Sequence, residues 1–208
     1  MKKKGLILIA VLAIALSIMQ IVILMGNSPA TSSGSNVKEV KAPDQKEAME
    51  NDLFKVEEYV SPKIDGTNVA LKGTATDNGY TDVYPAANAI DGRRESASYW
   101  EGGTSGPSQI NVKLEKAYTI HTIRIGLCPD TIWGPRTQTL SVKTSDDGKA
   151  WKDLIPEKDY DFDPKTGNEI ILKDFGNVKT QYVQVEITKN TGANGGQIAE
   201  LEIYSNDK

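Results

Sequence analysis

The chain has 208 residues, of which 38% are hydrophobic and 25% are charged, and its formal net charge is −4. This length allows one domain with a single core. Basic and acidic residues are interleaved and no basic patch appears beyond the N-terminus, which argues against nucleic acid as a partner. Cys128 is the only cysteine, and this excludes an intramolecular disulfide.

Residues 1–26 have the pattern of a membrane anchor. Lys2-Lys3-Lys4 precede an unbroken apolar run from Gly5 to Met25. At about 1.5 Å per residue, a helix over this run would cross a bilayer core. We therefore expect a single-pass cell-membrane protein, with residues after 26 outside the cell by the positive-inside rule. The alternative is a cleaved secretory signal, although Ser28-Pro-Ala30 is a poor cleavage site. Cleavage would leave a secreted protein.

Residues 27–67 are predicted to be a linker. Residues 27–42 are rich in Ser, Gly, Thr and Pro, which is typical of a flexible tether. Asp44 and Glu47 have capping-box spacing, and apolar residues then recur at helical intervals. We expect a short helix at about residues 45–58, ended by Pro62. It is either a spacer packed lightly on the following domain or a surface for a protein partner.

From residue 68 onward, short runs of alternating apolar residues replace helical spacing. Turn signals such as Asp146-Asp-Gly148 and Gly192-Ala-Asn-Gly-Gly196 separate these runs. Repeated short strands without helices between them predict an all-β, antiparallel β-sandwich. The predicted strands contain Ile110, Val112 and Leu114; Ile123, Ile125 and Leu127; Leu140 and Val142; Ile170 and Leu172; residues 182–187; and residues 198–203.

Two stretches that are distant in sequence carry the polar groups of greatest interest. One runs from Tyr84 to Glu101 and the other from Gln197 to Tyr204. They supply two carboxylates, Asp91 and Glu200, together with carbonyls that a turn leaves outside any ladder. Oxygens of this kind suit a hard cation such as calcium.

Several short motifs occur in an order that is similar to one known family. The chain resembles the discoidin domain, also called the coagulation-factor type C domain, whose bacterial branch is carbohydrate-binding module family 32. The resemblance covers residues 68–205 and implies a galactose-binding-domain-like jelly roll. The lack of a disulfide between the ends of the domain favours the bacterial branch. The motifs are Asn68-Val-Ala-Leu71, Ala89-Ile-Asp-Gly92, Tyr99-Trp100, Ser145-Asp-Asp-Gly-x-x-Trp151, Tyr182-Val183 and Ala199-Glu-Leu-Glu202.

The resemblance implies a structural Ca²⁺ that joins the first loop to the last strand. Side-chain oxygens would come from Asp91, Glu200 and Ser98, with Ser96 as the alternative to Ser98 in a loop longer than the family pattern. The resemblance also assigns backbone carbonyls to Asn88, Arg93 and Ala199. Without a metal, Asp91 would form an Asx turn and Glu200 would lie on the surface.

The resemblance places ligand loops at one end of the sandwich. Trp133 lies between two predicted strands, where its ring would be either a platform for the C–H face of a pyranose or a lid on the core. Hydrogen-bonding groups for the hydroxyls of a sugar would come from Arg136, Glu101, Asn190 and Asn194.

The remaining candidates are interpreted as structural. Trp100 is expected to be buried near the ion, and the resemblance implies that Trp151 packs against the core. His121 has no partner at zinc-ligand spacing. The sequence contains no nucleophile elbow, zinc-protease motif or P-loop, so we expect no enzyme activity. A glycosidase would need only two well-placed carboxylates and is the less favoured alternative.

We therefore expect a non-catalytic carbohydrate-binding module on the outer side of the cell membrane. Its partner would be an extracellular or cell-wall polysaccharide. The sequence around Trp100 and Trp133 resembles that of modules attached to α-glucan-degrading enzymes, so an α-glucan is a candidate ligand. A cell-surface domain that binds proteins is the alternative. The sequence leaves the oligomeric state open.

Overall fold

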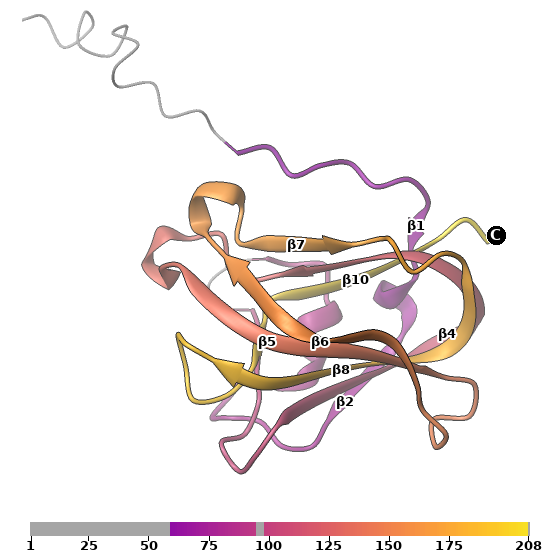
Figure 1. The fold of residues 1–208 in the computed structure, drawn as a ribbon, viewed down its shortest axis with the longest axis horizontal. Helices are drawn as coiled ribbons and strands as arrows, with labels where there is room; N and C mark the ends of the chain where they lie inside the picture. Colours follow the sequence, from indigo (N-terminus) through magenta and orange to yellow (C-terminus); the bar gives the residue numbers. More distant parts are fainter. Residues whose placement is uncertain (1–58, 95–97, 208) are drawn as a thin grey trace, which may run out of the picture. The chain divides into compact units, whose positions relative to one another are not determined.

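A computed structural model describes residues 59–94 and 98–207 (Figure 1). The predicted membrane anchor at residues 1–26, the tether and the predicted helix at about residues 45–58 lie outside this part. Within the described residues, no helix is both long and apolar enough to cross a membrane.

The described part of the chain consists of β-strands and single-turn 3-10 helices. This confirms the predicted all-β class. The strands are β1 (Thr67–Asn68), β2 (Thr74–Asp77), β3 (Trp100–Glu101), β4 (Ser108–Gly126), β5 (Arg136–Ser145), β6 (Lys152–Phe162), β7 (Glu169–Leu172), β8 (Val178–Asn190), β9 (Gln197–Ile198) and β10 (Glu200–Ser205). The 3-10 helices are η2 (Val69–Lys72), η3 (Ala86–Ile90), η4 (Thr131–Trp133) and η5 (Pro164–Thr166).

The long strand β4 connects the two layers of the sandwich. All strand pairs are antiparallel, and the main sheet has the order β1-β10-β4-β8-β5-β6, with β2 and β7 also paired to β4. The first half of β4 pairs with β2 and β8. The second half pairs with β10 and β7, and it also pairs with β8 at Tyr118–Ile120. The register breaks between Lys113 and Tyr118, where the strand passes from one layer to the other. Figure 1 shows β7 and β10 in the upper layer and β2, β5 and β8 in the lower layer.

The core lies between these layers and follows the alternation seen in the sequence. Inward residues of both layers are fully buried because side chains on a strand alternate between its two faces. Burial of each such aliphatic side chain stabilises the fold by about 1.5–3 kcal/mol. These residues include Ile110, Val112, Leu114, Ile123, Ile125, Leu140, Val142, Val183, Val185, Leu201 and Ile203.

Strand β6 was not predicted, because most of its residues are exposed and it has no apolar alternation. It pairs only with β5 and forms an edge of the sheet. Its register shifts between Ile155, opposite Val142, and Lys158, opposite Leu140. Pro156 lies in this irregular stretch and has no N–H, which protects the edge against pairing with another chain.

Contacts with the sandwich begin before residue 68, the predicted start of the domain. Among the described residues, these contacts begin at Tyr59. The Tyr59 hydroxyl and Ser61 Oγ both donate to the Glu169 carboxylate, at 2.8 and 2.6 Å. Glu169 has a side chain that is 1% exposed, and it also accepts from Arg94 Nη1 at 2.6 Å. The last residues of the predicted linker are thus part of the folded domain.

Candidate functional site

Asp91 and Glu200 lie together at one corner of the sandwich, as the sequence predicted. Asp91 is the C-cap of η3, and its Oδ1 accepts the Arg93 N–H at 2.9 Å, which is an Asx turn. Its Oδ2 accepts Ser98 Oγ at 2.5 Å. Glu200 begins β10, and its carboxylate accepts the Gly92 N–H at 3.1 and 3.2 Å. The early loop is therefore held against the last strand.

Glu200 is 3% exposed, so the alternative of a surface position is wrong. Burial, followed by the negative charge of Asp91, raises the pKa of Glu200 to about 8. Hydrogen bonds from the Gly92 and Arg93 backbone act in the opposite direction but do not offset the increase. The buried carboxylate of Glu200 beside the exposed carboxylate of Asp91 favours a cation between them.

The other predicted metal ligands surround the same loop. Asn88 is in η3 and its side-chain amide donates to the Tyr99 carbonyl at 3.0 Å. Ser98 is buried, and Ala199 is buried with its N–H donating to Gly126 O at 2.8 Å. Arg93 is exposed, and Ser96 lies outside the described residues. Within the described residues, no three Asp, Glu, His or Cys side chains cluster, so a cation here would need backbone carbonyls.

Trp133 lies in the loop between β4 and β5. This loop is at the left-hand end of Figure 1. Asp130 caps η4 by accepting the Ile132 N–H at 3.1 Å, and this turn positions the indole. The ring is half-buried and meets Tyr99 edge-to-face, with centroids 4.6 Å apart. Tyr99 in turn stacks on Tyr84 at 4.1 Å. The indole thus contacts the core and is also partly open to solvent.

Arg136, Gln197 and Glu101 form a connected polar group beside Trp133. The Arg136 guanidinium lies 4.9 Å from the Trp133 ring and donates to the Trp133 carbonyl and, at 2.5 Å, to Gln197 Oε1. Gln197 Nε2 donates to Glu101 Oε2 at 2.8 Å. Burial lowers the pKa of Arg136, which remains a cation. The buried amide of Gln197 therefore connects a cation and an anion.

Asn190 and Asn194 belong to the loop after β8. Asn190 Nδ2 donates to Gly195 O at 2.8 Å, and its Oδ1 accepts the Gly192 N–H at 2.9 Å. Its amide therefore shapes the loop as well as contacting Gln197 Oε1 at 3.4 Å. Asn194 is exposed on the same loop.

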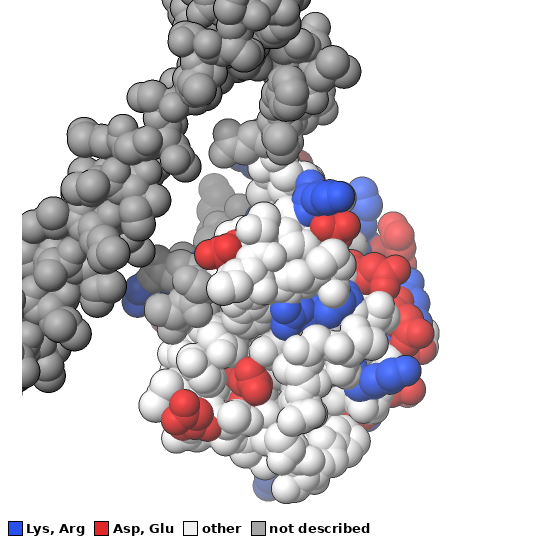
Figure 2. Space-filling view, turned by 90° about the vertical axis from the view of Figure 1, so that its left-hand side faces the viewer, with Lys and Arg blue, Asp and Glu red and all other residues white. Residues whose placement is uncertain are grey.

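The structure thus brings Trp133, Arg136, Glu101 and Asn190 together and places Asn194 nearby. Figure 2 looks onto this end, which is mostly uncharged, with basic side chains near the centre and most charged groups at the right-hand margin. Sequence reasoning missed Gln197, Tyr84 and Tyr99 as parts of the site. Tyr84, Tyr99 and Gln197 all lie in the two stretches that the sequence emphasised, but no local pattern assigned a role in ligand binding to any of the three.

The other tryptophans differ from each other. Trp100 is fully buried, as predicted. Trp151 is only half-buried and is not part of the core, so the prediction of a core position is wrong.

His121 is half-buried, and its Nδ1 lies 2.9 Å from Thr122 Oγ1. Cys128 is a buried free thiol.

A β-sandwich with aromatic and hydrogen-bonding side chains gathered in end loops has the architecture of a binding domain. The family model of the F5/8 type C domain matches residues 71–201. The chain therefore belongs to this family, the discoidin family that its motifs resemble. No match was found among curated proteins.

Solved structures with the same fold include several carbohydrate-binding modules. A pectin-binding module is 26% identical, with a TM-score of 0.54, and the match covers 64% of this chain and 91% of that one. The family 32 module of NanJ from C. perfringens, solved with galactose, is 18% identical, with a TM-score of 0.57 and coverage of 68% and 100%. A module of a Clostridium perfringens protein, solved with GalNAc-β-1,3-galactose, is 19% identical, with a TM-score of 0.54 and coverage of 66% and 99%. These relatives are binding modules, in agreement with the prediction of a non-catalytic domain.

Proposed function

We propose that the domain binds an extracellular or cell-wall polysaccharide through the loops at the end that carries Trp133. The observation that carries this proposal is the group formed by Trp133, Arg136, Gln197 and Glu101. The indole offers an apolar face to a pyranose, and the polar chain offers donors and acceptors fixed by mutual hydrogen bonds. The carbohydrate-binding modules with the same fold support this choice of ligand.

The proposal includes a structural Ca²⁺ at the corner formed by Asp91 and Glu200. The donor set fits, because it consists of carboxylate, hydroxyl and carbonyl oxygens. Asp91, Ser98 and Glu200 would supply side-chain oxygens, and Asn88, Arg93 and Ala199 would supply carbonyls. The ion would stabilise the loop that runs into Tyr99, and Tyr99 contacts Trp133.

Membrane display is the other part of the proposal. The apolar run at residues 5–25, preceded by lysines, supports a membrane anchor with the sandwich outside the cell. Many copies on one membrane would bind a repeating polysaccharide with an avidity above that of a single site.

A glycan array with the full-length chain tests this function. The chain would be purified in a detergent without a sugar head group, and α-glucans and pectins would be screened first. We expect Trp133→Ala to weaken binding to the best glycan about tenfold, which corresponds to ~1.4 kcal/mol. Ile132→Ala is the matched control, because Ile132 is 82% exposed beside Trp133. Binding only to envelope proteins would instead support an adhesion domain.

A further inference from the structure

A second groove lies on the outer face of the lower layer, away from the loops around Trp133. It has a volume of about 480 Å³ and crosses strands β2, β4 and β8. The strand registers place Thr74 opposite Lys113 and Lys113 opposite Tyr182, and the next row contains Thr76, Asn111 and Gln184. These residues alternate with the buried ones, so their side chains point outward.

Two aromatic residues form one wall of this groove. Trp151 follows the turn between β5 and β6 and is half-buried there. The Tyr182 ring is held between the backbone of Gly148, where an added Cβ would lie 2.9 Å from the ring, and the Lys113 ammonium, 5.9 Å from the ring centroid. The Tyr182 ring is therefore held in place before any ligand arrives, and the partly exposed indole of Trp151 offers apolar ring surface beside a polar floor.

The floor is rich in groups that hydrogen-bond to a ligand. Gln184 Nε2 donates to Asn111 Oδ1 at 2.8 Å. Gln184 Oε1 and Asn111 Nδ2 therefore remain available to accept from and donate to a ligand. Among the described residues, the hydroxyls of Thr74 and Thr76 and the indole N–H of Trp151 have no hydrogen-bond partner. Rings together with amides and hydroxyls match the two faces of a pyranose.

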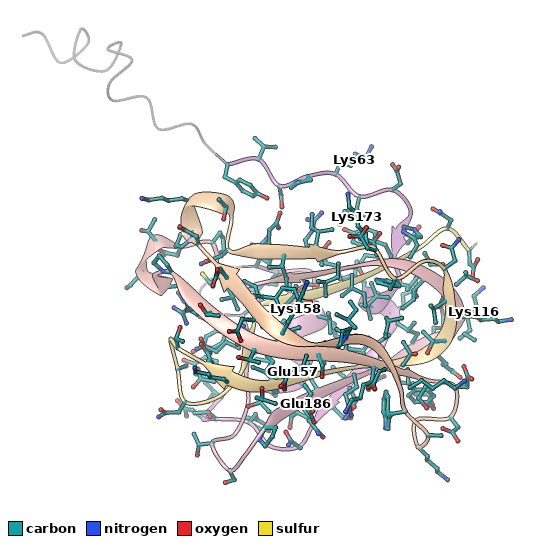
Figure 3. The ribbon with its side chains drawn as sticks, viewed as in Figure 1. Lys63, Lys116, Glu157, Lys158, Lys173 and Glu186 are labelled. Carbon is teal, nitrogen blue, oxygen red and sulfur yellow. The ribbon has the colours of Figure 1, made fainter. Side chains whose placement is uncertain are left out.

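The charges on this face select the class of sugar. Glu186, labelled in Figure 3 and two residues beyond Gln184 on β8, is paired with Lys143 at 3.7 Å and accepts from Gln109. The Asp147 carboxylate accepts the backbone N–H groups of its own turn. Lys113 has no ion pair within the described part of the chain. A uronate carboxylate on a sugar ring would complement this cation.

We propose that this groove, defined by Lys113, Trp151, Tyr182 and Gln184, is a second binding site that takes an acidic, uronate-bearing polysaccharide. The inference rests on the proposed function, since it assigns the same class of ligand to a second face. Tyr182 and Asn190 are eight residues apart on β8, which corresponds to about 26 Å, so the two sites are separate. One long chain that reaches both would bind with increased avidity.

Fluorine NMR of the full-length chain tests the groove directly. The chain has three tryptophans, so 5-fluorotryptophan labelling gives one signal for each region. Trp133 reports on the end loops, Trp151 reports on the groove, and the buried Trp100 is an internal control. The probes are an oligogalacturonate and its methyl ester, which lacks the charge.

We expect the oligogalacturonate to shift the Trp151 signal saturably and the methyl ester to do so at least threefold more weakly. Lys113→Gln should weaken the Trp151 response about three- to fivefold, as expected for one partly screened charge. Lys173→Gln is the matched control, an exposed lysine beside β7 in the other layer (Figure 3), and should leave the response unchanged.

A Trp151 signal that does not respond, or an equal response to both probes or in Lys113→Gln, would overturn the proposal. If only the Trp133 signal responds, the result supports the binding site in the end loops and contradicts the binding site in the groove. If only the Trp151 signal responds, the result supports the groove and contradicts the role of Trp133 as a platform for sugar.

Discussion

The carboxylate of Glu200 accepts the backbone N–H of Gly92 with both of its oxygens, at 3.1 and 3.2 Å. This contact joins the loop after η3 to the last strand, far along the chain. Asp91, directly before Gly92, adds a second negative charge at the same corner. The corner therefore combines backbone hydrogen bonds that stabilise the loop with a charge repulsion that destabilises it.

The first prediction concerns pH in the absence of calcium. The pKa of Glu200 is about 8 in the folded domain, above its ordinary value of 4.5, so the folded state holds a proton that the unfolded state releases. The stability that this proton gives is complete at pH below 4.5 and is lost as pH rises toward 8. In the presence of a chelator, we expect the melting temperature to decrease as the pH is raised from 5 to 8. Glu200→Gln should flatten this slope, whereas Glu157→Gln, an exposed carboxyl on β6, should not.

The second prediction concerns calcium. Added Ca²⁺ should raise the melting temperature of the chelator-treated chain at pH 7.5, because the ion replaces the proton that Glu200 holds and neutralises the carboxylates of Asp91 and Glu200 together. Each kcal/mol by which the bound ion stabilises the folded state should raise the melting temperature by about 2–4 °C for a domain of this size. Asp91→Ala should abolish the increase, and Asp130→Ala, in a different loop, should retain it. A melting temperature that does not change with Ca²⁺ in the wild type would rule out the metal.

The third prediction concerns Gln197, which connects Arg136 to Glu101. Gln197→Ala leaves two partly buried charges without their shared partner, which costs about 1–3 kcal/mol. We expect a lower melting temperature and weaker glycan binding at the Trp133 end. Gln197→Glu should be more informative, because its carboxylate would attract Arg136 and repel Glu101. Binding by this variant should improve as the pH falls and the added carboxyl is protonated. Isothermal titration at pH 5 and pH 8 measures the difference, and equal affinities would contradict this account.

Much of the fold could be predicted from the sequence because side-chain burial repeats with the period of a strand. Ile110, Val112 and Leu114 marked β4 in this way, whereas β6 has no such pattern because its residues lie on an exposed edge. The pairing of Asp91 with Glu200 could be predicted only from the family motifs. No local pattern joins residues more than one hundred positions apart.

The site was predicted in part for a similar reason. Trp133 and Arg136 attract attention as an aromatic and a cation in one short loop. Gln197 does not, because its importance comes from partners contributed by β3 and β5. The family resemblance predicted that Trp151, after the Asp-Asp-Gly turn, would pack against the core. It directly precedes Lys152, which pairs with Thr144, so it lies at the hairpin end, where the inward layer is no longer closed around it.

The fourth prediction concerns the segment before β1. Burial would raise the pKa of Glu169, but hydrogen bonds from Ser61 and Tyr59 and the charges of Arg94 and Arg124 outweigh it and lower the pKa. The stability that comes from this carboxylate is therefore present above pH 4.5 and is lost as pH falls below that value. Ser61→Ala should lower the melting temperature at pH 7 by a few degrees, since a hydrogen bond to a charged group contributes about 1.5–3 kcal/mol.

The control for this prediction is Lys63→Ala, since Lys63 lies in the same segment (Figure 3) and is exposed. Its melting temperature should match that of the wild type. The difference in melting temperature between Ser61→Ala and the wild type should shrink as the pH falls below 4.5, because Glu169 loses its charge in both chains as the medium becomes more acidic. The opposite pH dependence of Glu200 acts on both chains equally and cancels in the difference. A difference in melting temperature that does not shrink at any pH below 4.5 would mean that Ser61 acts through packing rather than through the carboxylate of Glu169.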